Sequence, residues 1–308
     1  MILRRITETT TLLLISIAGF AQLPPATGVT TESGVLDGVY VQEHIPTKRV
    51  IQYTHLREAD VMWSKRVWRT IDLREKMNYQ LYYPLVPISD RMSLFEVIKY
   101  AALQESTLTL YDVGALQDDQ FKDPVIKRSV ESEEDFQVRK ESFFGVLETV
   151  EKLDADGEPM FDDEGFPVTE ELVNDYITDE IIKYEIKEDW FFDKQRSVLD
   201  VRIIGISPVV YYKNANDDIA AEINLFWLYF PECRYVFQNF FVYNEKNDAQ
   251  RMSFDDLFWK RDFSSIIHKE SNVFDRKVAP IWVGLDALLE SERVKGEMFQ
   301  LEHDIWNL

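Results

Sequence analysis

Residues 187–243 constrain the fold of this chain more than any other stretch, because they are dense in β-branched and aromatic side chains. Two runs within them, 198–212 and 223–230, carry few charges and suit the pleated surface of buried or half-buried strands. The polar residues 193–196 predict a turn before the first run. Pro231 predicts the end of the second run, since it has no backbone N–H to donate. The stretch therefore predicts a central sheet on which other segments pack.

Two further segments have the apolar period of an amphipathic helix. In residues 57–77 the apolar positions are Val61, Trp63, Val67, Trp68 and Ile71. Lys65, Arg66, Arg69 and Arg74 would make this segment a basic helix in an acidic protein. Residues 284–307 form the longest helical pattern, with Ala287, Val294, Met298, Leu301 and Ile305 on one stripe. The second segment predicts a C-terminal helix that packs on the body of the protein or on a neighbouring subunit.

Shorter elements surround the predicted sheet. Ser93 and Glu96 match a capping box before a helix at 94–104, and Ser253 is expected to begin another helix. Short helices are predicted at 133–139 and 170–176, and strands at 107–111, 143–153, 180–189 and 264–268. Residues 234–243 are apolar enough to be either a buried helix or a buried strand. The prediction is an α+β fold: a central, mostly antiparallel sheet with packed helices, an extended N-terminal arm and a C-terminal helix.

The start of the chain is typical of an exported protein. Arg4 and Arg5 precede an apolar run at 12–17, and small residues flank Phe20, so residues 1–21 are predicted to be a cleaved signal peptide. Residues 22–50 are rich in Pro, Gly, Thr and Val without periodicity, and are predicted to be an extended arm. Residues 51–308 then form a single α+β domain. No later stretch is long and apolar enough to predict a membrane span.

Charge and cysteine content restrict the possible partners. A net charge of −21 repels nucleic acid and anionic membranes, so partners of those classes are not expected. The lone Cys233 lies far from the predicted cleavage site, which argues against a lipid anchor there, and it excludes an internal disulfide. Its apolar surroundings predict a buried, inert thiol.

Residues 154–167 repeat one acidic turn pattern, D-x-[DE]-G-x-P, twice. Glycine at this spacing permits tight turns, so the insertion near 154–170 predicts a small projecting β structure. Asp154, Asp156 and Glu158 alternate as calcium ligands do, which gives a weaker alternative. Against it, Pro159 stands where an EF-hand loop requires glycine.

The sequence contains no recognisable catalytic motif, and we predict that the protein is not an enzyme and needs no cofactor. Its four histidines lack metal-ligand spacing, and no phosphate-binding glycine loop is present. Ser207 follows Gly205 but precedes Pro208, which would remove the N–H that a nucleophile elbow uses. The alternative is an exported enzyme that acts on glycans, because its carboxylate pair is set in space and not in sequence.

Aromatic and arginine side chains next to charges are the remaining candidates for function, because such residues are enriched at protein interfaces. The predicted interface residues are Trp63, Trp68, Arg69, Trp190, Phe191, Arg234 and Trp259. Burial in the core is the competing interpretation. An aromatic glycan-binding module is another alternative, and it would require Trp190 or Trp259 on a flat, exposed platform.

Five blocks of sequence resemble the GldN (PorN) gliding-motility family. They are VMWSKRVWRTIDLREKMNYQLYYPL, EDWFFDKQRSVLDVRIIGISP, LFWLYFPECRYVFQNF, NDAQRMSFDDLFWKRDFSSIIHKESNVFDR and EHDIWNL. They occur in the family's order from about residue 60 to the C-terminus. The resemblance therefore covers most of the predicted mature chain.

The resemblance implies a structural component of the type IX secretion system of Bacteroidota, located in the periplasm at the outer membrane. It also implies partners: an outer-membrane lipoprotein resembling GldK (PorK), with which the family forms rings, and the periplasmic part of a motor component resembling GldM (PorM). An acidic, unacylated exported chain needs such an anchor to stay at a membrane. We expect the arm, the basic helix and the aromatic residues to contact these neighbours.

Overall fold

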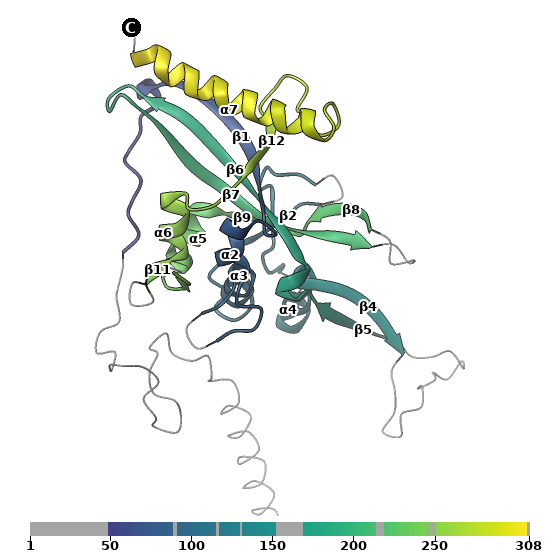
Figure 1. Ribbon diagram of the computed structural model, residues 1–308. Coiled ribbons are helices and arrows are strands. Elements are labelled where there is room, and N and C mark those ends of the chain that lie inside the picture. Colours follow the sequence, from purple (N-terminus) through teal and green to yellow (C-terminus); the bar gives the residue numbers. More distant parts are fainter. Residues whose placement is uncertain are drawn as a thin grey trace, which may run out of the picture.

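The computed structural model describes residues 49–88, 91–114, 117–129, 131–151, 169–213, 219–244, 247 and 251–306 (Figure 1). The predicted signal peptide, nearly all of the arm and the acidic turns lie outside these residues. The calcium candidates Asp154, Asp156 and Glu158 lie outside them as well. The predictions for these segments therefore remain predictions.

A large antiparallel sheet forms the centre of the molecule. Its path runs β12-β1-β6-β7-β9-β2-β3, with β8 paired to β7. The strands are β1 (Val61–Asp72), β2 (Leu110–Asp112), β3 (Asp123–Pro124), β6 (Ile181–Asp193), β7 (Val198–Lys213), β8 (Ile219–Asn224), β9 (Trp227–Tyr229) and β12 (Ile266–Glu270). Every pair of neighbouring strands in it is antiparallel. The predicted α+β class with a mostly antiparallel sheet is confirmed.

The predicted turn at 193–196 joins the two longest strands, β6 and β7, into a hairpin. The Asp193 carboxylate accepts the Gln195 N–H at 2.9 Å and the Arg196 Nε–H at 2.6 Å, which closes the turn. The second predicted run, 223–230, is wrong as a single strand. β8 pairs with β7 at 209–213 and β9 pairs with it at 205–206, so two short strands share one edge of β7.

The predicted basic helix at 57–77 is wrong, because most of this segment is the strand β1, after the short 3-10 helix η1 (Glu58–Asp60). Both faces of the sheet are covered around Val67 and Trp68, so neighbouring positions are buried together. The buried positions 67, 68 and 71 are therefore separated by three and four residues, which is also the apolar spacing of a helix. The predicted helix at 170–176 is also wrong. It is the strand β5 (Thr169–Asp175), which pairs with β4 (Gly145–Glu151) in a separate projecting hairpin.

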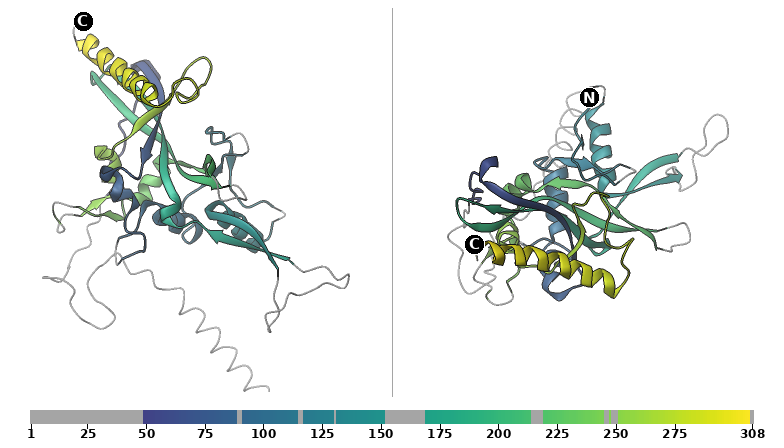
Figure 2. Two further views of the ribbon diagram at one scale, coloured as in Figure 1. Left: turned by 45° about the vertical axis from the view of Figure 1, so that its right-hand side comes forward. Right: turned by 90° about the horizontal axis from the view of Figure 1, so that it is seen from above.

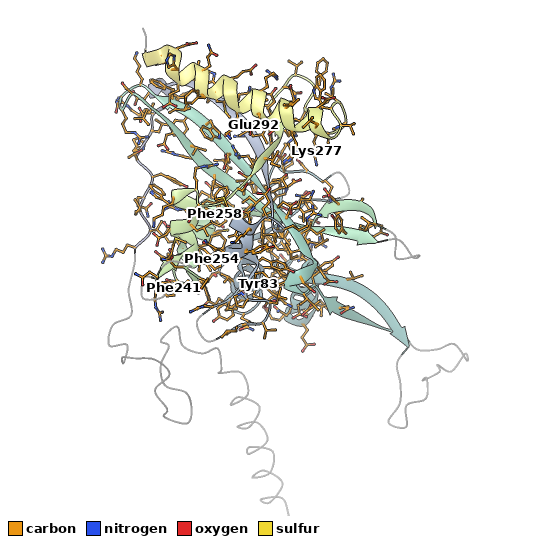
Figure 3. The ribbon with its side chains drawn as sticks, in the orientation of Figure 1. Tyr83, Phe241, Phe254, Phe258, Lys277 and Glu292 are labelled. Carbon is orange, nitrogen blue, oxygen red and sulfur yellow. The ribbon has the colours of Figure 1, made fainter. Side chains whose placement is uncertain are left out.

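Helices cover one part of the sheet and form the main hydrophobic core, which we call the base. They are α2 (Tyr79–Tyr82), α3 (Leu94–Leu103), α4 (Glu133–Glu141), α5 (Phe230–Phe237) and α6 (Phe254–Lys260), with the 3-10 turns η2 (Lys76–Asn78), η3 (Ser142–Phe144) and η4 (Thr178–Glu180). Ser93 and Ser253 cap α3 and α6, each accepting a backbone N–H with its hydroxyl. The full capping box forms at Ser253 with Asp256, whereas at α3 only the serine half of the predicted box is present. Figure 3 shows Phe254 and Phe258 of α6 in this base.

Residues 234–243, whose composition allows either a helix or a strand, contain both. The helix α5 ends at Phe237, and β10 (Phe241–Val242) pairs with β11 (Met252–Ser253). Pro231 stands in the first turn of α5, where its missing N–H costs no helical hydrogen bond.

The C-terminal helix α7 (Leu285–Trp306) is confirmed, and it lies across the opposite part of the sheet from the base (Figures 1 and 2). Val294 and Met298 on its apolar stripe are buried against Val67 and Ile267. The Ser291 hydroxyl accepts the Ile267 N–H at 3.0 Å. We call this part of the molecule the upper region. Among the described helices, none has both the length and the apolar character needed to cross a bilayer.

Candidate functional site

Two side chains with nucleophilic potential are buried and held by structural contacts. Cys233 is 1% exposed, and burial raises the pKa of its thiol well above the ordinary value. The Ser207 hydroxyl is fully buried and accepts the Asn224 amide N–H at 3.1 Å. Neither group can therefore meet a substrate as a nucleophile. The expected inert thiol at Cys233 is confirmed as buried and free of disulfide bonding.

His268 on β12 is largely withdrawn from water, and its Nδ1 lies 2.8 Å from the Thr70 hydroxyl oxygen. Burial lowers the pKa of His268 to about 4, although Glu185, with a carboxylate oxygen 3.7 Å from Nε2, opposes this. The imidazole is thus neutral at neutral pH. Within the part of the chain that the structure describes, no group of three or more histidine, cysteine or acidic side chains could hold a metal ion.

Six of the seven predicted interface residues fall into three clusters of aromatic rings and charges, and the seventh, Phe191, is buried with Arg202 over its ring. The first lies under α7, where Trp63 and Trp190 pack against the small apolar cluster. The Trp190 indole N–H donates to fully buried Glu188 at 3.1 Å, and Arg261 reaches the same carboxylate at 2.8 Å. Arg69 is 8% exposed and donates through Nε to the Ser265 hydroxyl at 2.9 Å. This cluster joins β1 and β6 to the segment after α6.

The second cluster lies on the other face of the sheet around Trp68, which is 7% exposed. Its indole N–H donates to the Asp119 carboxylate, and Lys187 contacts the same carboxylate at 3.2 Å. Burial lowers the pKa of Lys187. Burial by itself would raise the pKa of Asp119, but the Lys187 charge and the Trp68 N–H hold that pKa below its ordinary value. The pair fastens the loop after β2 to the sheet.

The third cluster lies beside α5 and α6. Arg234 is 3% exposed and donates to both carboxylate oxygens of Asp255, through Nε at 2.8 Å and Nη2 at 3.3 Å. Its guanidinium stands 4.5 Å from the ring centre of Tyr53 and 5.0 Å from that of Trp259. The Tyr53 and Trp259 rings stack with centroids 5.7 Å apart. The segment that precedes β1 is thereby held on α6.

These positions change what the predicted interface residues can do. Trp68, Arg69, Phe191 and Arg234 are buried inside the subunit, Trp63 and Trp190 are half-buried, and Trp259 is exposed. The buried ones support a surface and do not present one, so direct partner contact for any of the seven stays a prediction. Trp190 does not form the flat platform expected of a glycan-binding module, because it packs against the cluster under α7. Trp259 is exposed, and the Tyr53 ring stacks on it.

The basic side chains of β1, expected to face partners, are engaged within the subunit. Lys65 pairs with Glu270 at 2.6 Å and Arg66 with Asp189 at 2.5 Å. Arg74, just after the strand, pairs with Asp72 at 2.8 Å. Arg66 and Arg74 stay 43% and 69% exposed, and contact of these side chains with a partner remains a prediction.

Sequence reasoning missed an exposed apolar surface at the start of α7, which we call the apolar ridge. It consists of Val273, Phe274, Ile281, Trp282, Val283, Leu285, Leu288 and Leu289, each between 43% and 97% exposed. Large apolar side chains left in water in two neighbouring stretches of the chain, 273–274 and 281–289, favour an interaction site in this region. In the sequence, the apolar run Ile281-Trp282-Val283 before the helix indicates this surface.

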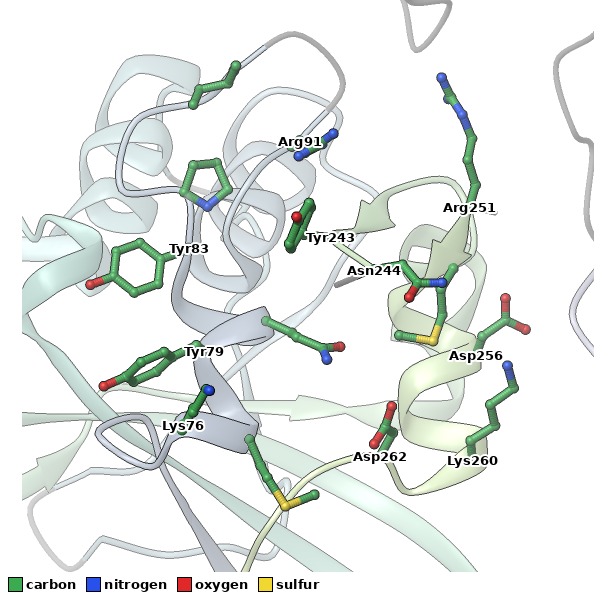
Figure 4. Close-up of a pocket in the computed structure, with 15 residues that line it drawn as sticks. Lys76, Tyr79, Tyr83, Arg91, Tyr243, Asn244, Arg251, Asp256, Lys260 and Asp262 are labelled. Carbon is green, nitrogen blue, oxygen red and sulfur yellow. The ribbon is translucent and has the colours of Figure 1, made fainter. Parts of the chain in front are cut away.

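A second missed feature is a groove of about 880 Å³ between α2 and α6 (Figure 4). Tyr79, Tyr83 and Tyr243 line it with exposed rings, and Arg91 stacks on Tyr243 at 4.9 Å. Asp256 and Asp262 are its acidic lining residues. Asp256 accepts the Ser253 N–H at 3.3 Å in the cap of α6, so it serves the fold.

The fold and these surfaces define a class: an α+β protein whose described part offers an apolar docking surface and a groove, with its thiol and its candidate serine buried. The chain belongs to the GldN family, because the family model described as gliding motility associated protein GldN matches residues 56–307. The search of curated proteins found no match. Family membership makes the protein a component of gliding motility and type IX secretion, and it confirms the resemblance seen in the sequence.

Proposed function

We propose that this protein is a non-catalytic structural subunit of the type IX secretion and gliding apparatus, located in the periplasm at the outer membrane. In this proposal it assembles into a ring with an outer-membrane lipoprotein resembling GldK (PorK), and it contacts a motor component resembling GldM (PorM). Family membership supports the machinery, and the secretory pattern of residues 1–21 supports the compartment.

The observation that carries the structural role is the apolar ridge. Leu285 is 69% exposed and Leu289 is 59% exposed, at one end of a helix that the subunit itself anchors elsewhere. Leaving such side chains in water costs about 25 cal/mol per Å² of apolar surface, so a partner that covers the ridge gains that free energy. The buried thiol and hydroxyl and the neutral imidazole support a role without catalysis.

The test replaces Leu289 by glutamate and compares it with Ile126→Glu. Ile126 is 61% exposed and lies beside α4, where its carbonyl accepts the Arg139 guanidinium N–H at 2.8 Å, so the two variants add the same charge at matched exposure. We expect Leu289→Glu to lose co-purification with the lipoprotein and to reduce secretion about tenfold, while Ile126→Glu retains both. Normal assembly and secretion by Leu289→Glu, at a wild-type level of folded protein, would contradict the proposal.

A further inference from the structure

The segment before β1 is tied to one side of α6. Residues 51–54, which we call the strap, line a cavity together with Asp255 and Trp259 of that helix. The Tyr53 ring stacks on Trp259, and the Thr54 carbonyl accepts the Arg202 guanidinium N–H at 2.6 Å. The strap therefore fixes the point from which the preceding residues must leave the domain.

The groove lies on the other side of the same helix. Asp256 and Lys260 of α6 line the groove, whereas Asp255 and Trp259 face the strap. One helix, about 10–12 Å across, separates the two sites. In the sequence, residues 22–48 precede the strap, and Val41 is eight residues before Arg49. At about 3.3 Å per extended residue, that length is ample to pass around the helix.

The groove and the arm match in chemistry. The groove has exposed apolar lining at Tyr79, Tyr83 and Ile88. The ammonium groups of Lys76 and Lys260 also line it, and neither forms an ion pair with another described residue. With Arg91 and Arg251, the lining carries four cationic side chains against the two carboxylates of Asp256 and Asp262, an excess of positive charge in a chain of net charge −21. It attracts an acidic segment and repels a basic one.

The arm supplies such a segment. Residues 35–43 read VLDGVYVQE, in which apolar residues surround Tyr40 and carboxylates stand at Asp37 and Glu43. An extended chain of this pattern presents aromatic and aliphatic side chains to tyrosine rings, with carboxylates available to the lysines. The two requirements of the groove, apolar contact and negative charge, are both met.

We propose that residues 35–43 of the arm dock in the groove between α2 and α6 of the same molecule. The strap delivers the arm to α6, and the docked arm wraps that helix from both sides. The proposal concerns an intramolecular contact of the isolated chain, so it stands or falls independently of the role in secretion.

The experiment places the photoreactive residue p-benzoylphenylalanine at Tyr40 in the purified chain and maps cross-links by mass spectrometry. We expect cross-links to peptides covering 76–91 or 243–262. Mixing isotopically heavy and light chains distinguishes contacts within a molecule from contacts between copies, and we expect only unmixed products. The double variant Lys76→Glu/Lys260→Glu should lower the cross-link yield about fivefold, and high salt should lower it in the same direction.

The matched control is Lys122→Glu/Lys295→Glu, which adds the same charge at exposed lysines outside the groove and should leave the yield unchanged. Cross-links to other surfaces, no cross-links, or heavy–light products would each overturn the proposal. Equal loss of yield in both double variants would overturn it too, because the groove lysines would then have no particular role.

Discussion

The base and the upper region share the same long strands but differ greatly in what holds them together. The main cluster of the base contains 32 buried hydrophobic residues, whereas the cluster beneath α7 contains four. The exposed apolar ridge belongs to the upper region, at the end of α7 that lies before its buried residues. The part of the molecule that offers apolar surface to a partner is therefore the part on which the fold depends least.

The largest loss of stability is expected for a substitution in the core of the base. Phe144 is fully buried and packs on Phe95 and Phe226, with ring centroids 5.9 and 4.9 Å away. Phe144→Ala leaves a cavity among these rings and should lower the free energy of unfolding by about 3–5 kcal/mol. Urea denaturation followed by circular dichroism measures this. A loss below about 1 kcal/mol would contradict the idea that the base is the tightly packed part of the molecule.

The second largest loss of stability is expected when the buried ion pair between α5 and α6 is broken. Arg234→Met leaves the Asp255 carboxylate without its guanidinium, in a site where the two side chains are 3% and 11% exposed. We expect a loss of about 3 kcal/mol in the free energy of unfolding, because an unpaired buried charge is costly. The double variant Arg234→Met/Asp255→Leu should recover much of the loss. If it does not, the stacking of Arg234 on Tyr53 and Trp259 matters more than the charge pair.

Acid should weaken the upper region through His268. Its pKa is about 4 in the folded protein against an ordinary value of 6.5, so the unfolded chain binds the proton more readily between these pH values. The stabilisation is complete above about pH 6.5 and is lost as the pH falls towards 4, by roughly 2–3 kcal/mol. Measuring the free energy of unfolding from pH 7 to pH 4 gives its slope against pH. His268→Asn should reduce that slope, and an unchanged slope would assign it to other groups.

The smallest effect on global stability is expected at α7 itself. Met298→Ala removes one of the two buried anchors of the helix and should cost roughly 2 kcal/mol, confined to the upper region. Hydrogen exchange should quicken in α7 and β12 while α3 and α5 keep their protection. Equal acceleration in both regions would mean that the four-residue cluster is part of one cooperative core.

The same contrast explains how much of the fold can be predicted from the sequence. The hairpin β6–β7 and the caps at Ser93 and Ser253 depend on neighbouring residues, and local patterns predict them. The sequence of β1 has the apolar spacing of a helix because side chains on both faces of this strand are buried. Segments far away in the sequence cover those faces, so local patterns cannot predict the burial. β5 is missed for a similar reason, since its partner β4 lies on the far side of the acidic insertion.

The candidate site is harder to predict than the fold. The stack of Tyr53 on Trp259 and the bond from Trp68 to Asp119 join residues far apart in the chain, so no local spacing indicates them. The aromatic and arginine side chains predicted at an interface do gather into clusters. Their burial cannot be predicted from the charges beside them, because Asp255, Glu188 and Asp119 neutralise the cations inside the protein.

The strands β6 and β7 run from the base to the turn at 194–197 in the upper region, with register shifts in their pairing at 181–183 and at 187–188. Their hydrogen bonds lie across the strand direction, as in any antiparallel pair. A pull applied at α7 and resisted at the base acts along these strands, across the direction of the hydrogen bonds that join them. In a machine that moves cells, such a hairpin can carry tension between its two ends.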